Sequence, residues 1–130
     1  RHPGQQQGRR AVAAHQFELT MDSVWNWGDP VIGVHRTWLS SNIKPGVIWS
    51  NTQSYVSPVV DDLLARATVE RDVDKRKKLY ADFQRQVVAD LPVIFTHVWA
   101  QGYAARKDLL NVPESIWAPM APWDTVTRRK

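Results

Sequence analysis

The hydrophobic positions predict two amphipathic helices in the middle of the chain. The first begins after Ser57, a favourable N-cap, with Pro58 at the first helical position. The second begins at Asp72 or Asp74 and runs to about Ala89. Their apolar faces recur at helical spacing and comprise Val59, Val60, Leu63, Leu64 and Ala67 in the first helix and Leu79, Tyr80, Phe83, Val87 and Val88 in the second.

Two other segments have the pattern of β-strands. Residues 17–25 alternate between apolar and polar, as a half-buried strand does, and end at a Gly-Asp-Pro turn over 28–30. Residues 92–100 are β-branched and aromatic and predict a second strand. Between them, residues 31–39 fit either a short helix or an extended piece, and residues 40–57 predict a long ordered loop.

The chain divides into three stretches. Residues 1–14 are a polar tail, expected to be disordered or non-native, with a short helical turn at its end. Residues 15–112 hold the predicted strands and helices, with one further helical turn at 108–110, and residues 113–130 read as an extended tail. Since two strands do not make a stable sheet alone, we expect the chain to be incomplete, with partner strands in missing sequence or in another copy.

The net charge of +4 is concentrated at the two ends of the chain. The ends hold six of the 17 basic residues, which leaves 11 basic against 13 acidic residues between positions 11 and 127. The body is therefore mildly acidic, and this argues against a nucleic-acid partner, which needs basic side chains gathered on a folded face. The six terminal residues are Arg1, Arg9, Arg10, Arg128, Arg129 and Lys130.

The sequence predicts no enzyme, no metal site and no cofactor. It has no cysteine, which excludes disulfides, thiolate zinc sites and a cysteine nucleophile. The Gly-x-Ser-x-Gly elbow, the His-Glu-x-x-His zinc motif and glycine-rich phosphate loops are absent from it. His35 and His97 lack an acidic or serine partner at a recognised spacing, so a structural role is the better interpretation for both.

The strongest candidate site is the segment Trp25-Asn26-Trp27-Gly28-Asp29-Pro30 at the end of the first predicted strand. Two of the seven tryptophans could form pocket walls there, Gly28 permits a close approach, and the Asp29 carboxylate could hold a ligand ammonium group. The alternative is a structural turn in which Asp29 caps its own backbone and the tryptophans belong to the core. The residues alone favour neither.

The order and spacing of several segments resemble the C-terminal part of family 5 extracellular solute-binding proteins. These are the dipeptide, oligopeptide and nickel-type receptors of bacterial ABC importers. The chain departs from the family pattern at Ser54, Val56, Ser57 and Val59. The matching segments are FELTMDSVWNWGDP (17–30), WLSSNI (38–43), WSNTQSYVSPVVDDLLARA (49–67) and DVDKRKKLYADFQRQVVADLPVIF (72–95).

The resemblance implies an α/β protein with a two-lobed, periplasmic-binding-protein-like (type II) fold. This chain would be a C-terminal fragment of it, with few strands and two amphipathic helices. In peptide-binding members an aspartate of the matching Gly-Asp-Pro region holds the ligand's α-ammonium, a role that falls on Asp29. The resemblance makes Trp25, Trp27 and Trp49 candidate walls of the pocket, beside Gly28. His35 and Arg36 follow closely in the sequence and are candidates to face a ligand carboxylate by their position alone, since no family motif assigns them that role.

The implied function is that of the solute-binding component of an ABC importer, which captures peptides in the periplasm or outside the cell. Its partners would be a peptide or another small solute and the membrane permease subunits. Because closure of two lobes desolvates the ligand, the fragment alone is expected to bind weakly or not at all. The alternative is a stand-alone interaction domain that buries its apolar faces by self-association, as in a homodimer.

Overall fold

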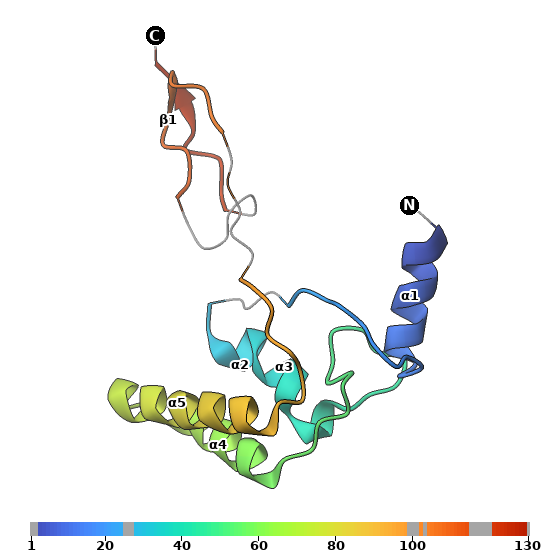
Figure 1. Ribbon diagram of the computed structural model, residues 1–130. Coiled ribbons are helices and arrows are strands. Elements are labelled where there is room, and N and C mark those ends of the chain that lie inside the picture. The colour runs from blue at the N-terminus through green and yellow to red at the C-terminus, as the bar shows by residue number, and fades with distance from the viewer. Residues whose placement is uncertain (1–2, 25–27, 99–101, 103, 115–120, 130) are drawn as a thin grey trace. The chain divides into compact units, whose positions relative to one another are not determined.

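The computed structural model describes residues 3–24, 28–98, 102, 104–114 and 121–129. The chain forms two compact units, Arg1–Ile94 and Phe95–Lys130. The first unit holds the helices α1 (Pro3–Ala13), α2 (Pro30–Gly33), α3 (His35–Trp38), α4 (Pro58–Val69) and α5 (Val73–Asp90), with a 3-10 turn η1 (Ser40–Asn42) (Figure 1). The second holds the strands β1 (Leu109–Leu110) and β2 (Thr127–Arg128).

The core of the first unit lies between α4 and α5, which run side by side in Figure 1. Val60, Leu64, Phe83 and Val87 form one buried apolar cluster. Both amphipathic helices predicted from the sequence are therefore confirmed, and the predicted inner positions are mostly correct. Val59 and Val88 are the exceptions, because they lie at the margins of the two stripes and stay exposed. Half-buried side chains complete the cluster: Val34, Trp38, Leu39, Tyr55, Leu63 and Tyr80.

Both helices begin at the capping residues that the sequence indicates. The Ser57 side chain accepts a hydrogen bond from the Val60 amide, and Pro58 occupies the first position of α4. Asp72, rather than Asp74, caps α5 and accepts from the amides of Asp74 and Lys75. These bonds satisfy amide groups that have no partner inside the helix, and so fix where each helix starts.

The ambiguous residues 31–39 are helical over most of their length, in α2 and α3; α2 contacts α3, and α3 contacts α4. Trp38 meets Tyr55 and Phe83 edge to face, with ring centroids 6.0 Å apart in both cases. Edge-to-face contacts add stabilisation beyond the buried apolar area. Trp38 therefore attaches α3 to the core cluster.

The predicted long loop is ordered around one buried side chain. Asn51 is fully buried, and its amide nitrogen donates to the carbonyls of Leu39 (3.1 Å) and Tyr55 (2.7 Å). Its side-chain oxygen accepts from the Tyr55 amide at 3.0 Å. A buried amide that satisfies both its donor and acceptor groups fixes the loop between η1 and α4 without regular secondary structure.

The two predicted strands are wrong for the described residues of this chain. Residues 17–24 and 92–98 carry no strand, and Leu19, Met21 and Val98 are 89%, 83% and 95% exposed. A strand is stabilised by hydrogen bonds to a neighbouring strand, and neither segment has one among the described residues. The sequence pattern is that of a strand, but the partner is lacking.

The N-terminal segment also differs from expectation, since α1 covers most of the predicted polar tail. Gln, Arg and Ala are good helix formers, and Pro3 stands at the first helical position. The end of α1 is joined to the 40–57 loop by a hydrogen bond of 2.6 Å from the Gly46 amide to the Ala13 carbonyl.

In the second unit, β1 and β2 pair antiparallel, Leu109 with Arg128 and Leu110 with Thr127. The helical turn expected at 108–110 is therefore wrong, and part of the expected tail folds back on this segment. Asp108 supports the pair through ion pairs with Arg106 and Arg128. Over the residues that the structure describes, none of the helices has the length and apolar character needed to cross a membrane.

Candidate ligand-binding site

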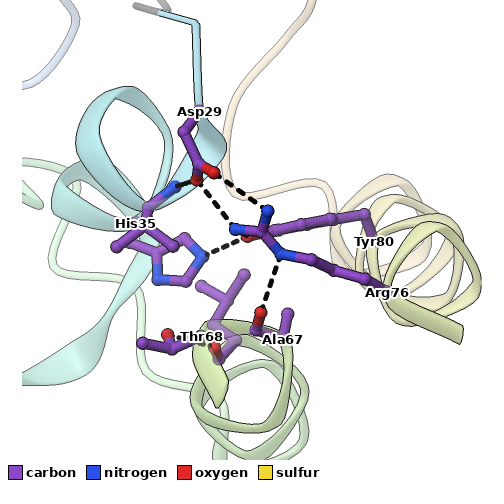
Figure 2. A network of polar contacts seen from close by, with 8 residues as sticks. Asp29, His35, Ala67, Thr68, Arg76 and Tyr80 are labelled. Carbon is purple, nitrogen blue, oxygen red and sulfur yellow. Dashed lines mark hydrogen bonds and ion pairs between the residues drawn. The ribbon is translucent and has the colours of Figure 1, made fainter. Parts of the chain in front are cut away.

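Asp29 stands at the start of α2 and is bonded inside the chain. Its Oδ1 accepts a hydrogen bond of 2.9 Å from the Val31 amide, and the residue is the N-cap of α2 (Figure 2). The structural alternative left open by the sequence, a self-capping turn, is therefore present. The Asp29 side chain nevertheless remains 43% exposed.

The second partner of Asp29 is Arg76, which reaches it from α5. The guanidinium forms a two-pronged ion pair, with Nη1 2.9 Å from Oδ2 and Nη2 2.8 Å from Oδ1. Its Nε donates to the carbonyl of Ala67 in α4 at 2.9 Å, and the group lies 5.5 Å from the centre of the Tyr80 ring. Arg76 thus joins the start of α2 to both helices of the core (Figure 2).

These contacts keep Asp29 ionised. The hydrogen bonds from Arg76 and then from the Val31 amide hold the pKa of the Asp29 carboxyl below its usual range. The same ion pair raises the pKa of Arg76. Two-pronged pairs of this kind fix the plane of the carboxylate as well as its charge.

His35 lies in the same network but is turned inward. Its side chain is buried, and its Nε2 is 3.0 Å from the Tyr80 hydroxyl (Figure 2). Burial lowers the pKa of His35, and burial raises the pKa of Tyr80. A buried histidine with a satisfied ring nitrogen agrees with the structural role that the sequence favours, and it leaves little surface for a ligand.

Of the remaining predicted site residues, the structure describes Gly28, Trp49 and Arg36. Gly28 has a φ of 43°, a left-handed conformation that glycine adopts readily, so it provides the turn into α2. Trp49 lies in the 40–57 loop with a φ of 67° and is 39% exposed; the described contacts of Asp29 do not include it. Arg36 is half-buried in α3. Trp25 and Trp27 lie outside the described residues.

Sequence reasoning missed Arg76, because it belongs to the run Lys75–Lys78, which looks like a solvated helix face. A signal was available in its spacing. Arg76 precedes Leu79, Tyr80 and Phe83 by three, four and seven residues, which places it on the inner stripe of α5. A cation on an apolar stripe predicts a buried or half-buried partner, here Asp29.

The structure also brings together a serine and a histidine, 39 positions apart. His15 Nδ1 is 3.0 Å from Ser54 Oγ. His15 Nε2 has no hydrogen-bond partner among the described residues, so the pair lacks the third group that orients the base in hydrolytic triads. Across the same residues, no group of three or more His, Asp or Glu side chains could hold a metal ion.

The chain matches no protein-family model, and no curated protein or solved structure matches it significantly. The resemblance to family 5 solute-binding proteins therefore stays a prediction made from the sequence.

Proposed function

We propose that this chain is part of an extracellular solute-binding receptor of an ABC importer, with a peptide as the solute and Asp29 as its anchor for the α-ammonium group. The observation that carries the proposal is the state of Asp29. Its carboxylate is ionised, held in one orientation and still 43% exposed. A carboxylate in this state can accept a charge-assisted hydrogen bond from a ligand ammonium.

The bonds of Asp29 leave room for one such contact. A carboxylate has about four acceptor positions. Val31 and Arg76 occupy two on Oδ1, and Arg76 occupies one on Oδ2. The remaining position, on Oδ2, is the one we assign to the ligand.

The exposed segments that precede and follow the helical core in the sequence support the receptor interpretation. Residues 17–24 and 92–98 have the composition of strands, and Leu19, Met21 and Val98 are largely exposed. In a larger α/β lobe they would pair with further strands and bury these side chains. The same exposure favours self-association as a second candidate function, in which another copy supplies the pairing.

The test is peptide binding by calorimetry to the full-length protein that carries this chain. Short peptides with a free amino terminus should bind, and the same peptides acetylated at the amino terminus should bind far more weakly. Asp29→Asn should lower the affinity about 10- to 100-fold, because a hydrogen bond between charged groups is lost.

Asp62→Asn is the matched control. Asp62 is also an aspartate paired with an arginine, but it lies on the open face of α4 with its side chain 61% exposed. This variant should leave peptide affinity unchanged. Equal affinity for free and acetylated peptides, or an unchanged affinity in Asp29→Asn, would refute the assigned role.

A further inference from the structure

The most connected side chain in the candidate site is Arg76. It contacts Asp29 before α2, the Ala67 carbonyl in α4 and the Tyr80 ring in its own helix. Its side chain is 28% exposed, the most buried guanidinium among the ion pairs of the described residues. An arginine that is half-buried and bonded in several directions has lost most of its freedom before any ligand arrives.

We infer that Arg76 is a positioning residue of the ligand site, which holds the Asp29 carboxylate in one orientation and leaves Oδ2 to accept from a ligand ammonium. The inference rests on the proposed function. Arg76 does not itself bind the ammonium, since both carry positive charge. It acts through Asp29, as groups behind a binding residue do when they fix its rotamer.

Three features of the geometry support this role over that of a surface ion pair. The pair is two-pronged, so the carboxylate cannot rotate without breaking a bond of 2.8 or 2.9 Å. The guanidinium is itself held by Ala67, whose carbonyl belongs to the last turns of α4. The carboxylate is further held by the Val31 amide, so its position is fixed from two elements.

The charged and titratable groups that face Asp29 are Arg76 and Tyr80 from α5 and His35 from α3. Arg76 is the main reason that the pKa of Asp29 is low. Loss of Arg76 should therefore raise this pKa, and peptide binding should then fail at a higher pH than in the wild-type protein. Loss of a residue that only stabilised the fold would weaken peptide binding without changing the pH below which binding is lost.

The experiment has two readouts, in the wild type and in Arg76→Gln. The first is the carbon-13 NMR titration of the Asp29 carboxyl in this chain, assigned with Asp29→Asn. The second is the pH profile of peptide affinity in the full-length protein. We expect Arg76→Gln to shift both midpoints upward together and to lower peptide affinity at pH 7 roughly tenfold or more.

Lys77→Gln is the control, because Lys77 is a neighbouring cation of α5 whose ion pair with Asp74 is exposed; it should move neither midpoint. Arg76→Lys keeps the charge but not the two-pronged geometry. The midpoints of the Asp29 titration and of the affinity profile should therefore lie between those of the wild type and of Arg76→Gln, and so should the peptide affinity. Arg76→Lys also serves as the test variant if Arg76→Gln does not fold.

Two results would overturn the inference. The first is an Asp29 titration that is the same with and without Arg76. The second is tighter peptide binding in Arg76→Gln, which would mean that the guanidinium repels the ligand more than it positions the carboxylate. Failure of the proposed function gives a different result. The wild-type protein would then bind no peptide at any pH, while the Asp29 titration would still decide whether Arg76 controls the carboxylate.

Discussion

At the scale of single residues, a small polar network joins the start of α2 to the helical core. Asp29 and Arg76 form its charged part, and the buried His35 contacts the half-buried Tyr80. Asp29 could be predicted from the sequence, because the Gly-Asp-Pro turn that contains it is a local pattern. Arg76 was not predicted, because its partner lies 47 positions away and only the tertiary fold brings them together.

The buried His35 predicts how stability depends on pH. Its pKa is lower in the folded chain than the value of about 6.5 in an unfolded one, so the unfolded state binds the proton first. The free energy of unfolding should therefore decline as pH falls below about 6.5. His35→Gln retains a hydrogen-bonding group near Tyr80 but does not titrate, and should flatten this decline.

Urea unfolding at several pH values between 7.5 and 5.5 measures the effect. His97→Gln, which removes an exposed histidine of the same chain, is measured beside it. If His35→Gln kept the wild-type pH dependence, burial of His35 would not be its cause.

At the scale of elements, the two long helices were predictable and the strands were not. The signals for α4 and α5 are local, because the caps Ser57 and Asp72 and the apolar stripes lie within the helices themselves. A strand depends on a neighbour, and residues 17–24 have none among the described residues. The alternating sequence pattern therefore predicts a strand only where a neighbouring strand is present to pair with it.

The interface between α4 and α5 should carry most of the stability of the first unit. Leu64 is fully buried in the shared cluster, so Leu64→Ala should lower the free energy of unfolding by about 2–5 kcal/mol. Val59 lies on the same helix but is 52% exposed, and Val59→Ala should cost no more than about 0.5 kcal/mol. Urea unfolding followed by circular dichroism compares the two; similar losses would contradict the assigned core.

At the scale of the whole molecule, residues 17–24 and 92–98 have the composition of strands but no partner strand among the described residues. Residues 17–24 expose Leu19 and Met21, and residues 92–98 expose Ile94 and Phe95. We propose that these segments pair with further strands of a larger solute-binding lobe, and self-association of a small domain is the competing explanation. The two differ in the size of the protein that carries the chain and in where the cell places it.

An immunoblot of fractionated source cells tests this difference most directly, with an antibody raised against residues 57–90, which span both long helices. If the chain is part of a receptor, we expect a band at several times the mass of this 130-residue chain, in the periplasmic or extracellular fraction. A band at the mass of the chain itself, in the cytoplasmic fraction, would contradict it and leave self-association as the function to study.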